Sequence, residues 1–127
     1  MKEQLTPNFN IKEWRCHDGT GVPYNLVDNV KECAHNLQIL RDKIGKPVHI
    51  ISGYRNPTYN KRIGGARKSY HMKCMAADIK VKGMTPRQVK AAIEDLIADG
   101  LMKQGGVGIY KTFVHYDVRG RRSRWVG

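Results

Sequence analysis

The chain has 127 residues, which is enough for one hydrophobic core and leaves no room for a second. Its apolar content of 40% is ordinary for a folded protein, and no apolar run is long enough to span a bilayer. The N-terminal residues MKEQLTPNF carry charge but lack the apolar segment of a secretory signal, so we expect synthesis in the cytoplasm without a signal peptide.

The net charge is high for a chain of this size. Lys and Arg number 23 against 11 Asp and Glu, which gives a formal charge of +12 at pH 7. Such an excess predicts attraction to anionic polymers: nucleic acid, an acidic membrane or a bacterial wall. The positive residues are scattered, and only the C-terminal RGRRSRW is dense. A general surface property is therefore a simpler interpretation than a nucleic-acid reading site.

The three cysteines are Cys16, Cys33 and Cys74, an odd set without a Cys-x-x-Cys pair. This spacing argues against a disulfide framework and against a thiolate zinc finger, so free thiols are expected. Cys16 and the adjacent His17 could ligate a metal, but no matching pair lies nearby. We therefore interpret them as part of a loop.

The N-terminal third is expected to be an arm followed by a helix. Residues 1–25 contain a stretch rich in Gly, Pro, Asn and Asp, which predicts an irregular arm pinned to the core by its few apolar residues. Apolar residues then recur at helical spacing from Leu26 to Ile44 and predict one buried stripe. Gly45 and Pro47 follow, as at many helix C-termini.

The remainder predicts four strands and one long helix. The β-branched run 47–52 and the segment 76–81 read as strands, and 106–110 with 113–118 as a hairpin. Thr85, Pro86 and Gln88 have the pattern of a capping box at a helix start. The order of elements predicts a single α+β domain over residues 1–127, a small antiparallel sheet with helices packed on one side.

Three polar residues are candidates for a metal site. His71 follows a Gly-Gly loop, Asp78 lies near the start of a predicted strand, and His115 lies in the predicted hairpin. Two neutral imidazoles and a carboxylate are a ligand set typical of catalytic zinc. For any one of these residues taken alone, an ordinary structural role is the simpler interpretation. Together they suggest one metal ion, because buried charge needs a partner.

Several motifs, in the order in which they occur, resemble those of the zinc D-alanyl-D-alanine carboxypeptidase family. The similarity runs from about Asn8 to the C-terminal Arg-Trp. It implies the fold that this family shares with D,D-dipeptidases and the hedgehog signalling domain. The motifs here are Ser52-Gly53-Tyr54-Arg55, Gly64-Gly65, Ser69-x-His71, Ala76-x-Asp78 and His115-x-Asp117.

The resemblance implies a role for each matching residue. A single zinc ion would be bound by His71, Asp78 and His115. Arg55 would hold a substrate carboxylate or the developing oxyanion. The substrate cleft would be lined by Ser69 and by Tyr54, although Tyr54 could equally be a packing residue. Mn or Co could occupy the same ligands.

Two positions depart from the family pattern. Cys74 stands where the family has a glycine, so its side chain could pack in the core or crowd the metal. Thr112 stands three residues before the last ligand, where related enzymes often carry an acidic general base. Asp117 is the candidate substitute for that base, with Arg55 as the second catalytic residue. Asp117 could instead orient a metal ligand.

The resemblance implies a zinc metallopeptidase that hydrolyses peptide bonds of bacterial peptidoglycan, as a D,D-carboxypeptidase or an endopeptidase. We expect a monomer of phage or prophage type that acts on the cell wall once released, with its charge holding it to anionic wall polymers. The alternative is a non-catalytic zinc domain that binds a wall or protein partner. Specific nucleic-acid binding is not expected, because no recognition helix is visibly basic and no aromatic ladder is present.

Overall fold

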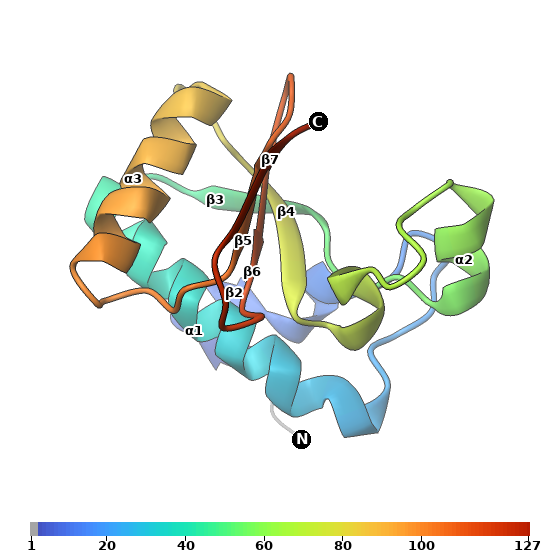
Figure 1. Cartoon of the computed structure of the whole chain (residues 1–127). Coiled ribbons are helices and arrows are strands. Elements are labelled where there is room, and N and C mark those ends of the chain that lie inside the picture. The colour runs from blue at the N-terminus through green and yellow to red at the C-terminus, as the bar shows by residue number, and fades with distance from the viewer. Residues whose placement is uncertain (1–2) are drawn as a thin grey trace.

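The computed structural model describes residues 3–127 and contains an α+β arrangement around one five-stranded sheet (Figure 1). The sheet has the order β3-β4-β6-β5-β7. Its strands are β3 (Val48–Ser52), β4 (Ala76–Val81), β5 (Gly106–Ile109), β6 (Val114–Asp117) and β7 (Ser123–Val126). The helices are α1 (Val27–Ile44), α2 (Pro57–Arg62) and α3 (Pro86–Ala98), with short 3-10 turns at Ile11–Trp14, Tyr24–Leu26 and Tyr70–Lys73.

The predicted fold class is confirmed, with one addition to the sheet. β3, β4, β6 and β5 pair antiparallel, as the hairpin pattern indicates. β7 then adds to the outer edge of β5 in the parallel direction. This strand was not predicted, because SRWV is short and lies within the basic C-terminal segment.

The two long helices cover one face of the sheet, formed by side chains such as Ala77, Ile79, Val114 and Tyr116. These four residues are fully buried. α1 packs against α3, and α3 packs against β5 and β6. Figure 1 shows both helices on the same side of the strands, while α2 lies away from them beyond β4. The opposite face of the sheet is therefore free to carry polar groups.

The helix boundaries follow the local signals in the sequence. α1 ends at Gly45, which adopts a left-handed conformation (φ 66°) that suits a residue without a Cβ. α3 begins with the predicted capping box, in which the Thr85 hydroxyl accepts from the Gln88 backbone N–H and the Gln88 side chain accepts from the Thr85 N–H. These local contacts account for the agreement between prediction and structure.

The N-terminal arm is more regular than expected. A small hairpin, β1 (Gln4–Thr6) with β2 (Phe9–Asn10), lies against α1. The side chain of Gln38 fixes it, because this amide accepts from the Thr6 hydroxyl and the Asn8 backbone. Further along the arm, His17 contacts the Ile51 carbonyl and the Tyr59 hydroxyl. His17 thus has the loop role expected of it.

Among residues 3–127, none of the helices combines the length and the apolar character that crossing a bilayer requires.

Candidate metal centre and substrate cleft

His71 is held by the backbone of Gly53, which packs against Trp14 of the N-terminal arm. The Nδ1 atom of His71 lies 2.7 Å from the Gly53 carbonyl oxygen, so this nitrogen carries the proton and donates. A Cβ on Gly53 would come within 2.7 Å of Trp14, which explains why the backbone here requires glycine. Trp14 is fully buried. The Gly53 carbonyl therefore fixes the tautomer of His71 and leaves its Nε2 lone pair facing the cleft.

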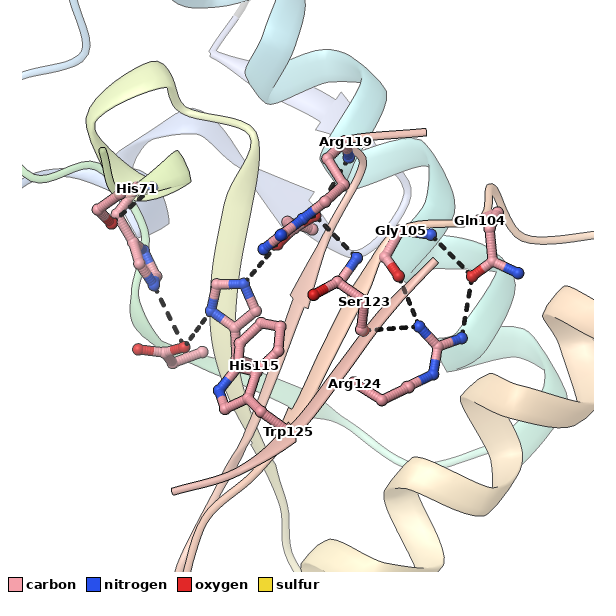
Figure 2. Close-up of polar contacts among 12 residues, drawn as sticks. His71, Gln104, Gly105, His115, Arg119, Ser123, Arg124 and Trp125 are labelled. Carbon is pink, nitrogen blue, oxygen red and sulfur yellow. Dashed lines mark hydrogen bonds and ion pairs between the residues drawn. The ribbon is translucent and has the colours of Figure 1, made fainter. Parts of the chain in front are cut away.

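His115 and Asp78 are brought together by strand register. β4 pairs with β6 so that Asp78 lies directly opposite His115, on the sheet face away from the long helices. The Nδ1 atom of His115 is 3.1 Å from Asp78 Oδ1, and His71 Nε2 is 3.2 Å from the same oxygen. In Figure 2, dashed lines from the labelled His71 and His115 imidazoles meet at one shared carboxylate. Side chains alternate along β4 and β6, so Asp78 and His115 share one face of the sheet, and the 3-10 turn Tyr70–Lys73 brings His71 to the same point.

The second oxygen of Asp78 faces Arg55. The Nη2 atom of Arg55 lies 3.2 Å from Asp78 Oδ2, and its Nε donates to the Ser52 hydroxyl at 3.3 Å. Arg55 also lines the cleft. The guanidinium is therefore anchored at the edge of the metal centre, close enough to meet a group that approaches the metal position.

Asp117 lies behind His115 and is fully buried. Its Oδ2 is 2.7 Å from His115 Nε2, the nitrogen that points away from Asp78. Arg119 donates to both carboxylate oxygens, at 2.8 and 2.7 Å, and the Gly106 backbone N–H donates to Oδ1 at 2.9 Å. Every face of this carboxylate is engaged. Its position fits the orienting role that was one of our two alternatives, and it does not fit a general base reaching into the cleft.

These contacts set the charge states of the centre. Burial alone would raise the pKa of Asp78, but hydrogen bonds with His115 and His71 hold it well below its usual range. Burial lowers the pKa of His71 and outweighs its contact with Asp78. For His115 burial acts in the same direction, but the flanking carboxylates Asp117 and Asp78 prevail and raise the pKa. Burial would also raise the pKa of Asp117, but hydrogen bonds with Arg119 and His115 hold it below its usual range. Both carboxylates are therefore ionised at pH 7, and His71 is neutral.

The three side chains fit a metal ion. His71, Asp78 and His115 each offer one ligand atom, and these atoms lie within 4.8 Å of one another. The donor set is two imidazoles and one carboxylate, which leaves a coordination position for water or substrate. Each histidine has its remaining nitrogen hydrogen-bonded, to Gly53 and to Asp117, as is usual for metal-bound histidines.

A cleft of about 600 Å³ opens over this centre. Ser69 is one of its lining residues, as expected, and its hydroxyl also accepts from the His71 N–H at 3.1 Å. Tyr54 is not one of them: it is buried in the hydrophobic core, and its N–H donates to the Trp14 carbonyl. We therefore assign Tyr54 to packing, the second of the two roles considered, rather than to substrate binding.

The C-terminal strand supplies a wall of the cleft that sequence reasoning missed. The Trp125 ring lies over Gly108, where any Cβ would clash with it, and its centroid is 5.0 Å from that of His115. Trp125 Nε1 donates to the Tyr110 hydroxyl at 2.9 Å, and Tyr110 stacks on Phe113. Figure 2 shows Trp125 beside His115 while Arg124 points the other way. In the sequence, the alternating glycines Gly106 and Gly108 were the signal from which the close approach of another side chain to this strand could have been predicted.

Neither family departure lies in the cleft. Thr112 lines a separate groove with residues such as His49 and Met84, so it does not face the metal centre. Cys74 is fully buried in the hydrophobic core. Burial raises the pKa of its thiol to about 12, so it stays protonated and does not compete for a metal. Of the two possibilities for Cys74, packing fits this placement.

Cys74 also adopts a left-handed conformation (φ 57°) that favours glycine. Cys74→Gly should relieve about 1 kcal/mol of backbone strain while losing about the same from the buried side chain, so its stability should stay near that of wild type. Cys74→Ala loses the side chain, keeps the strain and should cost about 1–2 kcal/mol. Urea unfolding of both variants tests this order. A glycine variant less stable than the alanine variant would contradict it.

The family profile described as Peptidase M15 matches residues 4–117. The chain is 39% identical over 136 aligned positions to the peptidoglycan L,D-endopeptidase MepK of Escherichia coli strain K12, covering 98% of this chain and 66% of that protein. It is 30% identical to the probable peptidoglycan L,D-endopeptidase MepK of Haemophilus influenzae, covering 85% and 58%. The chain thus spans about two thirds of the first relative's length. Both relatives are named endopeptidases rather than D,D-carboxypeptidases.

Proposed function

The chain belongs to the peptidase M15 family, and on that premise we propose that it is a zinc-dependent peptidase that hydrolyses peptide bonds of bacterial peptidoglycan. The observation that carries this proposal is the convergence of His71, Asp78 and His115, with both histidine tautomers fixed, beside Arg55 in an open cleft. The names of the relatives favour an endopeptidase over a carboxypeptidase.

Zinc is the metal that we propose, held by His71 Nε2, Asp78 and His115 Nδ1. When bound, it supplies a Lewis acid for the scissile carbonyl and lowers the pKa of a coordinated water. Two neutral imidazoles and one carboxylate leave the ion a net positive charge, as this chemistry requires. Mn or Co would accept the same donors, so the choice of zinc is part of the proposal.

The protein's own side chains would orient the metal ligands and stabilise the negative charge that develops on the substrate. Arg55 is fixed by Asp78 and Ser52, and its guanidinium would donate to the oxygen that becomes negative during attack. Asp117 holds the His115 ring by accepting from Nε2–H, so that Nδ1 keeps its lone pair toward the metal position. Ser69 caps the turn that carries His71. These groups are in place before substrate arrives, which is what transition-state stabilisation demands.

A second candidate, a non-catalytic metal domain that binds a wall or protein partner, is favoured by one observation. Within residues 3–127, Asp78 is the single carboxylate lining the cleft, and it is engaged by both histidines and Arg55. Asp117 is sealed behind His115. Among residues 3–127, a free carboxylate that could act as general base is therefore missing from the cleft.

Mass spectrometry of purified peptidoglycan fragments separates the two candidates. The fragments would be incubated with the protein, with the protein stripped by a chelator, and with the stripped protein reloaded with zinc. We expect new products that vanish on stripping and return on reloading, and their masses identify the bond. A fully zinc-loaded protein that yields no product from several wall chemistries would support the binding domain instead.

Metal affinity should fall as the pH is lowered. His115 must be neutral to bind a metal, and the carboxylates beside it raise its pKa above the ordinary value of 6.5. Protons therefore compete with the metal as the pH falls through that raised pKa, and affinity recovers above it. Competition with a chromophoric chelator between pH 5 and 8 measures this change. An affinity that does not vary over this window would contradict the assignment of His115 as a ligand.

We also propose that the protein acts as a monomer on the cell wall after release from the cytoplasm, with the charge of +12 favouring contact with anionic wall polymers. Analytical ultracentrifugation tests whether the protein is a monomer. Co-sedimentation with isolated walls at several salt concentrations tests whether charge holds it to the wall. Binding to walls that resists high salt would argue against the electrostatic part.

A further inference from the structure

The lining of the cleft is strongly biased toward positive charge. Asp78, its one carboxylate within the described chain, is already engaged by His71, His115 and Arg55. The cations that line it are Arg55, Lys68, Lys73, Arg119 and Arg121. A ligand that fills this cleft would therefore be favoured by carrying negative charge of its own.

Three of these five cations already contact other side chains. Arg55 pairs with Asp78, and Lys73 lies over the Tyr70 ring, 5.1 Å from its centroid. Arg119 is bound to Asp117 and stacks over the Tyr70 ring at 4.3 Å, so it is occupied by the protein itself. Lys68 and Arg121, in contrast, are exposed, and within residues 3–127 their side chains form no ion pair, hydrogen bond or contact with an aromatic ring. Their charges are available to a ligand.

Lys68 and Arg121 also belong to different walls of the cleft. Lys68 lies in the loop that leads into the turn carrying His71, and Arg121 lies between β6 and β7. The contact of Arg119 with Tyr70 joins these two segments, so the walls are held in a fixed relation. A ligand placed over the metal centre would thus meet one free cation from each wall.

We propose that Lys68 and Arg121 determine substrate specificity by binding free carboxylates of the peptide on either side of the bond that is cut. This inference rests on the proposed peptidase function and adds the substrate class, an acidic peptide with free side-chain or terminal carboxylates. An arginine can grip a carboxylate through two parallel N–H donors, and a lysine supplies a compact charge. Both groups are exposed, so the preference should weaken as salt rises.

The experiment uses two soluble cross-linked peptide fragments that differ only in whether the carboxylates near the cross-link are free or amidated. The ratio of kcat/KM for the two fragments is measured with the zinc-loaded protein. We expect wild type to prefer the free acid by about 10-fold or more, and Lys68→Gln/Arg121→Gln to lose most of that preference through KM. A matched control, Lys43→Gln/Arg87→Gln, removes the same charge at exposed positions on α1 and at the start of α3.

The possible outcomes are distinct. Equal kcat/KM for the free and amidated fragments in wild type overturns the inference and leaves the peptidase function standing. If the control variant loses the preference as fully as the cleft variant, the inference is overturned, and the preference is due to the net positive charge of the whole protein. A cleft variant impaired only on intact walls, and not on soluble fragments, assigns the two cations to wall phosphates instead. If neither fragment is cut, the peptidase function fails, and calorimetric titration of both fragments decides the inference, with equal affinities overturning it.

Discussion

Replacing His71 by alanine should abolish hydrolysis of peptidoglycan fragments. The variant loses the proposed metal ligand, whose Nε2 faces Asp78 and whose other nitrogen is anchored to Gly53. A metal at such a centre supplies several kcal/mol of transition-state stabilisation, so the expected loss in kcat/KM is about 1,000-fold or more. Product formation by mass spectrometry and metal content by elemental analysis are the measurements. His115→Ala should behave in the same way.

The control for this experiment is His35→Ala. His35 is an exposed residue of α1, outside the cleft, so the substitution removes an imidazole without touching the centre. It should retain full metal content and full activity. Because His71 is buried, circular dichroism must show that His71→Ala is folded. A folded His71→Ala that still carries a full equivalent of metal would overturn the ligand assignment.

Replacing Asp117 should reduce stability and metal affinity together. Asp117→Ala leaves the Arg119 guanidinium, the Gly106 N–H and His115 Nε2 without their acceptor, and breaking a buried charge pair costs about 3–5 kcal/mol. Asp117→Asn keeps the volume but lacks the charge and presents an extra donor to these groups, so a smaller loss is expected. Either variant should bind metal about 10–100-fold less tightly, because His115 is no longer oriented. Urea unfolding and chelator competition measure both effects.

The same variant decides between the two roles considered for Asp117. An orienting residue affects catalysis through the metal, so saturating zinc should restore much of the kcat of Asp117→Asn. A general base would instead leave metal affinity unchanged and depress kcat at every metal concentration. Asp95→Asn, at an exposed position on α3, removes an equal charge elsewhere and should leave stability, affinity and activity unchanged.

The position of Thr112 changes how its departure from the family pattern is understood. Thr112 faces a groove on another part of the surface, with His49 and Met84, and not the metal centre. An acidic side chain placed there by Thr112→Glu would therefore start outside the cleft and should not raise activity in this protein. The choice between the two candidate functions therefore depends on the lack of a free carboxylate anywhere in the described cleft lining. The identity of residue 112 alone does not decide it.

The sequence by itself determined the elements whose signals are local. The apolar stripe and Gly45 define α1, the capping box of Thr85 and Gln88 starts α3, and alternation along 76–81 predicts which face carries Asp78. Local spacing is sufficient in these cases because the contacts join residues a few positions apart. Together with the family motifs, it also named the three residues that converge in the metal centre.

Only the tertiary structure decided which groups support that centre. Asp117 is sealed behind His115 by Arg119, Tyr54 is turned into the core, and Trp125 reaches His115 because β7 adds to the edge of β5. Each of these placements depends on contacts between strands or loops far apart in the chain. Neither composition nor periodicity encodes such pairings, because they arise only when the sheet closes and burial forces each polar group to find a partner.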